Sequence, residues 1–250
     1  MPMAVIFPVV VPGFLGGSKG GGRSYAKIDG REVFLRCVEL YATRDQVSQR
    51  IVVVPPADLE EVHDRYSAHL GFQGVTVIGG GTDWFGCVAA AVATLEGGVD
   101  QVMIHDGACP AVPYTLLDAL EEGLGKNKNA AGIVPVLPTR SAFADVGQTA
   151  TGTGLVSEYV DMTKTYEVQS PQLFRKSPLV AAYGQRGSGT FMDDAELVQQ
   201  AGGKIATVMG SKFNMRIDSD EMVRLGKDLL EHMPKAKAKT PLTPFGEAEW

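Results

Sequence analysis

The sequence has 250 residues, of which 44% are hydrophobic and 21% charged, a composition typical of a globular protein that buries a substantial core. The formal net charge of −6 argues against a general nucleic-acid or membrane-surface binder, because such proteins usually present a broad basic face. No run of about 18 apolar residues is present, so we expect no membrane-spanning helix.

The cysteines and the first residues bear on where the protein works. Cys37, Cys87 and Cys109 are far apart in the sequence and form no CxxC pair. Their odd number and their spacing favour free thiols in a reducing compartment over a disulfide framework. The apolar residues 1–11 lack the basic region and cleavage site of a signal peptide, so we predict a buried first strand there. The sequence therefore predicts a soluble, cytoplasmic protein.

Short β-branched runs alternate with helical patterns along the chain. The predicted strands are nearly continuous in apolar residues, as is typical of strands covered on both faces, and they comprise residues 5–11, 51–54, 75–78, 102–104, 133–136 and 205–208. The predicted helices comprise residues 33–41, 57–70, 85–95, 114–124 and 193–200. This alternation predicts an α/β fold with a mainly parallel mixed sheet and helices on both faces. Ligands of such sheets bind beyond the carboxyl ends of the strands.

Two segments break the alternation. Residues 139–163 are rich in Gly, Thr and Ser and have little helical periodicity, so we predict a projecting β-arm; a long excursion of this kind is usually functional or contacts a partner. Residues 234–250 contain three prolines and a Lys-Ala-Lys-Ala-Lys run, and we predict a flexible tail. Residues 1–233 are predicted to form one domain that includes the arm.

Glycines gather in the loop that follows the first predicted strand. This loop contains Gly13, Gly16, Lys19 and Arg23. The backbone N–H groups of a Gly-rich loop can bind phosphate, and the two cations would add positive charge. The loop lacks the complete P-loop and dinucleotide patterns, and a solvated surface loop is the alternative interpretation.

An acidic residue stands at the end of the fourth predicted strand, in the run His105-Asp106-Gly107. A carboxylate at the tip of a strand lies where Mg²⁺ would bind through oxygen. The alternative is that Asp106 caps the next turn. For His105 we favour the interpretation of a packed core histidine. Asp106 is therefore the candidate metal ligand of this segment.

Three later segments contain polar residues of open significance. Residues 210–216 follow a predicted strand and bring together Lys212, Asn214 and Arg216, although a solvated charged turn explains the same residues equally well. Residues 170–174 read Ser-Pro-Gln-Leu-Phe and are interpreted as structural. Residues 192–195 read Met-Asp-Asp-Ala, and their acidic side chains suit the start of a helix.

Taken in order, these segments resemble the 2-C-methyl-D-erythritol 4-phosphate cytidylyltransferase family. The family has a Gly-rich loop after its first strand, a Gly-Gly pair that opens a helix, and the motifs His-Asp-Ala-Ala-Arg-Pro, Thr-Pro-Gln-x-Phe, Thr-Asp-Asp/Glu-Ala and Asn-x-Lys. The matching segments here are residues 13–23, 80–81, 105–110, 170–174, 192–195 and 214–216. The resemblance extends over about residues 4–230, and its specificity comes from six matches in one order.

The resemblance implies a GT-A-like, Rossmann-like α/β fold of the nucleotide-diphospho-sugar transferase type and a homodimer joined through the arm. It also implies Mg²⁺-dependent transfer of CMP from CTP to a polyol phosphate, such as 2-C-methyl-D-erythritol 4-phosphate, for isoprenoid synthesis. The implied catalytic residues are Lys19, Arg23 and Arg216. The implied nucleotide contacts are Gly13, Gly16, Gly80, Gly81, Cys87, Asp106 and Gly107, with Asp106 also holding Mg²⁺. The implied acceptor contacts are Thr139, Arg140, Met162 and Asn214.

The sequence departs from the family pattern at several of these positions. Arg23 and Arg216 stand where the family has lysine, whereas Cys109 and Met162 stand where it has arginine, and Cys87 replaces a serine. Losing one charge-assisted hydrogen bond to phosphate costs roughly 1.5–3 kcal/mol. Two alternatives therefore stay open: a catalytically impaired paralogue that binds a nucleotide or a protein partner, and a sugar-1-phosphate nucleotidyltransferase.

Overall fold

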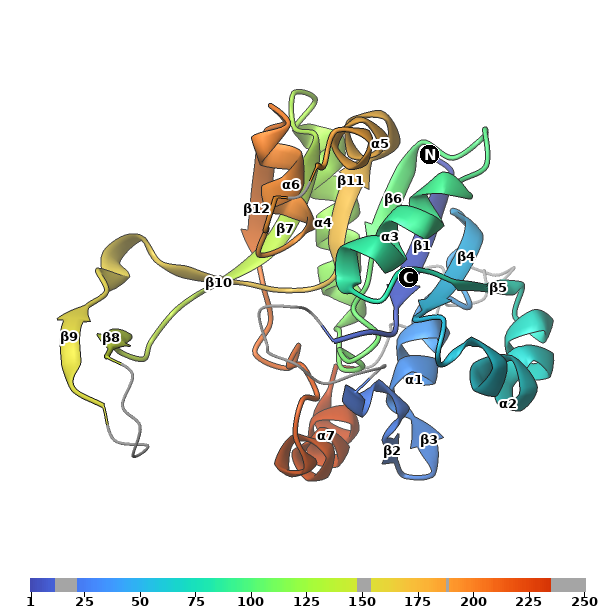
Figure 1. Ribbon diagram of the computed structural model, residues 1–250, viewed down its shortest axis with the longest axis horizontal. Helices are drawn as coiled ribbons and strands as arrows, with labels where there is room; N and C mark the ends of the chain where they lie inside the picture. Colours follow the sequence, from blue (N-terminus) through green and yellow to red (C-terminus); the bar gives the residue numbers. More distant parts are fainter. Residues whose placement is uncertain (12–21, 148–153, 188, 235–250) are drawn as a thin grey trace, which may run out of the picture.

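A computed structural model describes residues 1–11, 22–147, 154–187 and 189–234. The predicted loop residues Gly13, Gly16 and Lys19 lie outside this part of the chain, as do residues 235–250 of the predicted tail. A twisted sheet runs through the body of the molecule, and helices lie on both of its faces (Figure 1). The α/β architecture predicted from the sequence is confirmed.

Eight strands of the described residues form the main sheet. They are β1 (Met3–Pro8), β4 (Val47–Val54), β5 (Val75–Gly79), β6 (Gln101–Ile104), β7 (Gly132–Pro138), β10 (Tyr166–Val168), β11 (Gln172–Arg175) and β12 (Ile205–Met209). Their order is β10-β7-β11-β6-β1-β4-β5, and β12 also pairs with β7. Strands β10 and β11 run antiparallel to their neighbours, and the other pairs are parallel. The carboxyl ends of the parallel strands therefore meet at one edge of the sheet.

The strand β1 ends three residues earlier than predicted. Its pairing with β4 stops at Pro8 and Val53, and its pairing with β6 stops at Ile6 and Ile104. One further hydrogen bond follows, from the backbone N–H of Val9 to the backbone oxygen of Val53 at 2.9 Å, and the apolar residues after it do not continue the ladder.

In the part of the chain that the structure describes, three helices cover each face of the sheet. Helices α1 (Val33–Glu39), α2 (Leu59–Phe72) and α4 (Tyr114–Lys126) pack on one face, and α3 (Trp84–Ala93), α5 (Lys176–Gly184) and α6 (Asp194–Gln200) pack on the other. Along β1, Met3, Val5 and Phe7 enter the first core, whereas Ala4 and Ile6 enter the second. This double covering explains the continuous apolar run from which the strand was predicted.

A two-stranded ladder extends from the body between β7 and β10 (Figure 1). It consists of β8 (Ala144–Val146) and β9 (Val156–Tyr159), which pair antiparallel, and the short 3-10 helix η3 (Met162–Lys164) follows. The chain leaves the sheet through β7 and returns through β10, and these two strands pair with each other. Several apolar side chains of this ladder are exposed, among them Val146, Val156 and Tyr159.

Smaller elements complete the described structure. The 3-10 helix η2 (Gly22–Tyr25) leads into a hairpin of β2 (Lys27–Ile28) and β3 (Arg31–Glu32), and this hairpin packs against α7 (Asp220–His232). Ile28, Val33 and Ile217 form the small apolar core at this contact. Among the described helices, none has the length and apolar character needed to cross a membrane.

Candidate active site

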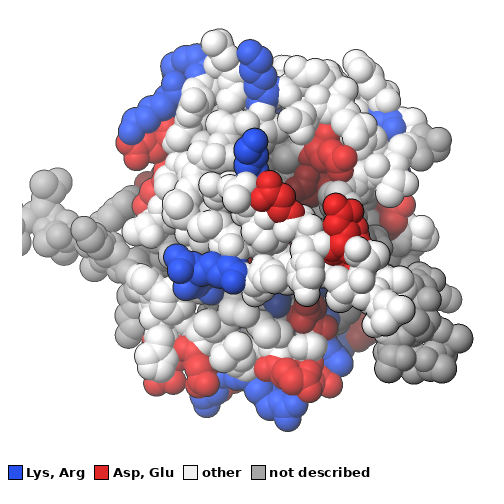
Figure 2. Space-filling model, turned by 90° about the vertical axis from the view of Figure 1, so that its left-hand side faces the viewer, with Lys and Arg blue, Asp and Glu red and all other residues white. Residues whose placement is uncertain are grey.

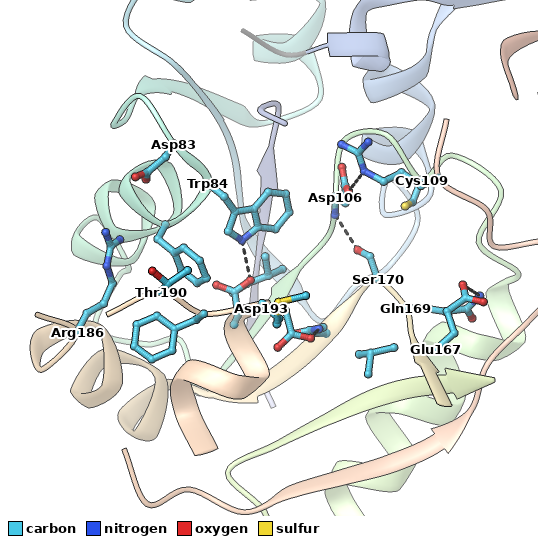
Figure 3. A pocket seen from close by; sticks show the side chains of 18 of the residues that line it. Asp83, Trp84, Asp106, Cys109, Glu167, Gln169, Ser170, Arg186, Thr190 and Asp193 are labelled. Atoms are coloured by element: carbon cyan, nitrogen blue, oxygen red, sulfur yellow. Dashed lines mark hydrogen bonds and ion pairs between the residues drawn. The ribbon is translucent and has the colours of Figure 1, made fainter. Parts of the chain in front are cut away.

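A cavity of about 740 Å³ opens at the carboxyl edge of the sheet. Its position follows from the register, because Ile104, the last residue of β6, pairs with Gln172, the first residue of β11, and both line the cavity. Figure 3 shows Asp106 and Ser170 toward one end of the cavity, Arg186 toward the other, and Trp84 between them. We call the end at Asp106 and Ser170 the polar end. The part that runs from Trp84 to Phe85 and Arg186 is called the aromatic end.

Asp106 is the central side chain of the polar end. Its Oδ1 accepts a hydrogen bond from the backbone N–H of Ala108 at 2.9 Å, and its Oδ2 accepts one from Nε of Arg216 at 2.7 Å. The side chain is 7% exposed, and the backbone N–H of Asp106 donates to Oγ of Ser170 at 2.8 Å. The carboxylate therefore caps the turn, which was the structural alternative, and also presents a charged pair with Arg216 to the cavity.

His105 supports this loop from inside the core. Its Nε2 lies 2.8 Å from the backbone oxygen of Cys109 and its Nδ1 lies 2.8 Å from the hydroxyl of Tyr41. Because a carbonyl only accepts, Nε2 carries the proton and Nδ1 accepts from Tyr41. Burial lowers the pKa of His105 to about 4, so the ring is neutral near pH 7. His105 is therefore a packed core histidine, as favoured from the sequence.

Asn214 closes the polar end from the loop after β12. The side chain is almost completely buried, and its Nδ2 donates to the backbone oxygen of Ser170. Within the part of the chain that the structure describes, its Oδ1 has no hydrogen-bond partner. A buried acceptor without a donor is costly in a resting protein, so Oδ1 is suited to accept a hydrogen bond from a ligand.

The predicted Gly-Gly pair forms a tight junction between β5 and α3. A Cβ atom on Gly80 would lie 2.5 Å from Cα of Cys87, and one on Gly81 would lie 2.7 Å from Cα of Gly86. The thiol of Cys87 donates to the backbone oxygen of Gly81 at 3.1 Å, and burial raises its pKa to about 12. Cys87 is thus a neutral packing residue, and neither it nor the glycine pair is among the described residues that line the cavity.

Gly107 also has a packing reason. Its backbone N–H donates to the backbone oxygen of Pro8 at 3.0 Å, and a Cβ atom would lie 3.0 Å from that oxygen and 3.1 Å from Cγ2 of Val9. This glycine lets the loop after β6 cross directly over the end of β1. It therefore fixes the orientation of the neighbouring Asp106.

The aromatic end contains a second buried aspartate. Asp194 is 2% exposed, its Oδ2 accepts from Nε1 of Trp84 at 2.9 Å, and its Oδ1 accepts from the hydroxyl of Tyr183. Burial raises the pKa of Asp194 to about 6. The guanidinium of Arg186 lies 5.3 Å from the ring centre of Phe85, at the outer part of this end.

Four residues predicted for the site lie elsewhere in this chain. Arg23 forms an exposed ion pair with Asp220 of α7 at 3.1 Å. Thr139 donates through Oγ1 to the backbone oxygen of Thr165 at 2.9 Å, Arg140 is exposed, and Met162 lies in η3; these three belong to the excursion between β7 and β10. Within one chain, the described cavity lining brings together Asp106, Asn214 and Arg216 but does not include these four.

Sequence reasoning missed most of the aromatic end and one wall of the polar end. The missed lining residues include Trp84, Phe85, Gln169, Arg186 and Phe191. The available signal was the run at residues 192–195, which contains the buried Asp194, but it was interpreted only as a helix start. Asp193 is indeed the N-cap, since its side chain accepts from the backbone N–H of Glu196.

The surface charge fits a small-molecule site better than a nucleic-acid interface. On the face shown in Figure 2, acidic and basic side chains are interspersed and neither sign forms a broad field. The net charge of −6 points the same way.

Comparison with known proteins gives the family. Residues 10–231 match the family described as IspD, 2-C-methyl-D-erythritol 4-phosphate cytidylyltransferase. The protein of that name from Acidobacterium capsulatum is 30% identical over 199 residues, which are 78% of this chain and 81% of the relative. The bifunctional enzyme IspD/IspF of Sinorhizobium medicae is 31% identical over 230 residues, which are 90% of this chain and 55% of the relative. The chain spans about half the length of the bifunctional relatives that it matches.

Solved structures share the fold. The 4-diphosphocytidyl-2C-methyl-D-erythritol synthase of Anaerococcus prevotii superposes with a TM-score of 0.73 at 17% identity, covering 92% of this chain and 98% of that one. The IspD protein of Francisella tularensis gives a TM-score of 0.71 at 19% identity, covering 92% and 100%. These likenesses confirm the predicted α/β class, and the sequence match confirms the resemblance. The chain belongs to the IspD family of 2-C-methyl-D-erythritol 4-phosphate cytidylyltransferases.

Proposed function

We propose that this chain transfers CMP from CTP to 2-C-methyl-D-erythritol 4-phosphate, or to a similar polyol phosphate, and releases pyrophosphate. The observation that carries the proposal is the cavity at the carboxyl edge of the sheet, where Asp106, Asn214 and Arg216 converge. Membership of the IspD family and a relative that bears this activity in its name support it.

The reaction joins two phosphates. An oxygen of the acceptor phosphate attacks the α-phosphorus of CTP, a new O–P bond forms, and the bond to the β-phosphate oxygen breaks with pyrophosphate leaving. The attacking oxygen is already anionic, so the site needs alignment and positive charge more than a strong base. Arg216 supplies that charge in the described cavity. We assign Lys19 and Arg23 of the nucleotide loop to the same task, for which Arg23 would have to leave its ion pair with Asp220.

The donor set suits Mg²⁺ that arrives with the nucleotide. Asp106 offers one carboxylate at the cavity, and the described residues contain no group of three His, Cys, Asp or Glu side chains that could enclose a metal. Mg²⁺ is commonly bound through one or two carboxylates together with substrate phosphates and water. Asp106 would hold the ion, which would neutralise phosphate charge, and Oδ1 of Asn214 would accept a hydrogen bond from a substrate hydroxyl.

We also propose a homodimer joined through the excursion at residues 139–163. Its exposed apolar residues Val146, Val156 and Tyr159 would be buried by a partner. Thr139, Arg140 and Met162, which do not line the cavity of their own chain, would then approach the acceptor in the partner's cavity. Sedimentation should show a dimer at micromolar concentration; a monomer alone would contradict this assembly.

A reducing cytoplasm suits the protein. Cys37, Cys87 and Cys109 are free and buried, so the described fold does not depend on an oxidising compartment. We therefore propose a cytoplasmic location.

One observation favours a second candidate, a catalytically impaired paralogue that binds a nucleotide or a partner. Cys109 lines the polar end where the family has arginine, and burial raises the pKa of its thiol well above the usual value. A neutral thiol provides no charge for phosphate, and Met162 provides none on the excursion. Such a protein would bind CTP without turning it over.

Pyrophosphate release tests the proposal. The protein is incubated with Mg²⁺, each of the four nucleoside triphosphates, and acceptors that include 2-C-methyl-D-erythritol 4-phosphate, other polyol phosphates and sugar 1-phosphates. We expect release with CTP and a polyol phosphate. Release with a sugar 1-phosphate would favour that nucleotidyltransferase class instead. Silence from folded protein, with an active relative assayed beside it, would favour the impaired paralogue.

A further inference from the structure

Gln169 connects the sheet to the loop that carries Asn214 and Arg216. It lies between β10 and β11, is 6% exposed, and is seen at the edge of the cavity in Figure 3. Its Nε2 donates to the backbone oxygens of Ser211 and Asn214 at 3.1 and 3.0 Å. Its Oε1 accepts from the backbone N–H of Ser211 at 3.0 Å. One side chain thus holds three backbone groups of the loop.

The orientation of this amide is determined by its neighbours. Nε2 faces two carbonyl oxygens, which can only accept, and Oε1 faces an N–H group, which can only donate. The backbone N–H of Gln169 donates to the backbone oxygen of Pro135 in β7 at 2.9 Å. The loop is therefore fastened to a residue that is itself fixed to the central sheet.

Gly210 leaves the space that the side chain of Gln169 occupies. A Cβ atom at this position would overlap Oε1 of Gln169 and would lie 3.3 Å from Cγ of Leu137. The backbone N–H of Gly210 donates to the backbone oxygen of Val136 at 2.8 Å, which prevents the chain from moving away. The amide of Gln169 can reach the loop because residue 210 has no side chain.

The fastened loop carries the cavity-facing groups of the polar end. Nδ2 of Asn214 donates to the backbone oxygen of Ser170, and Nε of Arg216 donates to Asp106. Loop bonds among residues 211–215 are local, such as those from the backbone N–H of Asn214 to Ser211 and from that of Met215 to Phe213. Hydrogen bonds within the loop determine its internal shape. Its position relative to the cavity depends on bonds to other parts of the chain, among them those from Gln169.

We infer that Gln169 is a positioning residue for the transferase reaction, holding residues 211–216 so that Asn214 and Arg216 face the reacting phosphates. The inference rests on the proposed function and deepens it. Gln169 acts through the loop, because the hydrogen-bonding atoms of its amide are engaged by backbone groups there. A misplacement of about 1 Å can cost roughly a hundredfold in rate, so a residue that makes no chemical contribution can still control turnover.

Four variants of the full chain test this inference. Gln169→Met keeps the length of the side chain and removes its hydrogen bonds, and Gly210→Ala pushes the amide from the opposite side. Gln101→Met is the matched control for the first variant, because Gln101 is also a buried glutamine. It begins β6 and therefore lies at the amino end of that strand, opposite the end where the cavity opens. Gly125→Ala controls the second, since a Cβ atom there meets nothing within 4 Å.

Hydrogen exchange gives a measurement that does not need activity. In Gln169→Met and Gly210→Ala we expect the amides of residues 211–216 to exchange at least about tenfold faster, because hydrogen bonds from the Gln169 side chain to the loop are lost or displaced. The two controls should leave this peptide unchanged. Unchanged exchange in both test variants would overturn the inference whatever the enzyme does.

Kinetics then separate positioning from general destabilisation. For Gln169→Met we expect kcat to fall about tenfold to a hundredfold while KM for CTP changes less than about threefold. Gln101→Met should keep kcat even where its melting temperature falls equally. A wild-type kcat in Gln169→Met would overturn the inference. A wild type without turnover would refute the proposed function instead, and the positioning of residues 211–216 by Gln169 would then be decided by hydrogen exchange.

Discussion

Two aspartates are buried in the same cavity and are stabilised in different ways. Asp106, at the polar end, pairs with the guanidinium of Arg216. Asp194, at the aromatic end, is held by the neutral donors Trp84 and Tyr183. Burial therefore raises the pKa of Asp194 to about 6, because hydrogen bonds from neutral groups do not replace the lost hydration of a full charge.

The different partners of the two aspartates indicate different roles: Asp106 is suited to bind a ligand, and Asp194 stabilises the packing of helices. The cation beside Asp106 lies on a loop and can exchange for another cation when a ligand enters. The donors to Asp194 belong to the buried surfaces of α3 and α5, so they cannot leave without disturbing the second core. We therefore expect changes at Asp106 to appear in catalysis and changes at Asp194 to appear in stability.

The largest expected effect is on catalysis at the polar end. Asp106→Asn removes the carboxylate proposed to hold Mg²⁺ and leaves Arg216 without its ion pair, so CTP-dependent pyrophosphate release should fall about a thousandfold. Steady-state rates measured at saturating Mg²⁺ check this. Asp118→Asn, at an exposed position of α4, should keep the wild-type rate. A rate near that of the wild type in Asp106→Asn would remove Asp106 from the site.

The next effect is on stability at the aromatic end. Burial holds the pKa of Asp194 in the native state at about 6, above its ordinary value of 3.8, so the native state binds one more proton than the unfolded state between these pH values. Stability from this group is present below about pH 4 and is lost as pH rises through 6, by about 3 kcal/mol. Urea titrations of wild type and Asp194→Asn should show this difference, and the exposed Asp64→Asn should not. If the free energy of unfolding depended on pH in the same way in wild type and Asp194→Asn, the proposed stabilising role of Asp194 would be contradicted.

A smaller effect sharpens the role of the Arg216 ion pair. Arg216→Gln removes the cation that competes for Asp106, so a divalent ion should bind about tenfold more tightly when no nucleotide is present. Mn²⁺, which takes similar oxygen ligands, can be followed by electron paramagnetic resonance. The Arg224→Gln variant, on the exposed face of α7, is the control. Equal Mn²⁺ affinity in wild type and Arg216→Gln would show that Arg216 does not compete for the site.

The smallest effect is expected outside the cavity. Cys87→Ser preserves a donor toward the backbone oxygen of Gly81, so activity should change less than about threefold. Kinetics with CTP as the varied substrate test this. A gain or loss beyond tenfold would mean that the side chain at position 87 reaches the nucleotide after all.

The fold was largely predictable because its strands are covered on both faces. The runs in β1, β4 and β7 are continuous in apolar residues and stand out without any structure. Strand β11 was missed because it has four residues without a β-branched side chain, and α5 because its third residue is Pro178 and its apolar stripe is weak. The antiparallel strand β11 was therefore not predicted, although its first residue, Gln172, lines the cavity.

The site was predictable where chemistry and sequence position coincide. Asp106 ends a buried strand, so its place at the sheet edge followed from the strand itself. Its pairing with Arg216 depends on bringing together residues that are far apart in the chain, which no local pattern reports. Gln169 was missed because its function lies in backbone bonds to a distant loop. The prediction for Cys87 concerned a nucleotide contact, and the structure orients that thiol toward Gly81.

The junction between β5 and α3 restricts which substitutions this sequence can accept. Gly81 and Gly86 each block the space that a side chain on the other would need, and Gly80 is blocked by the backbone of Cys87. A second substitution among Gly80, Gly81 and Gly86 cannot make room for a side chain at another of them, because all three residues already lack a side chain. In a saturation library these three codons should stay fixed as glycine, whereas Gly97 and Gly98, which face open space, should accumulate neutral replacements.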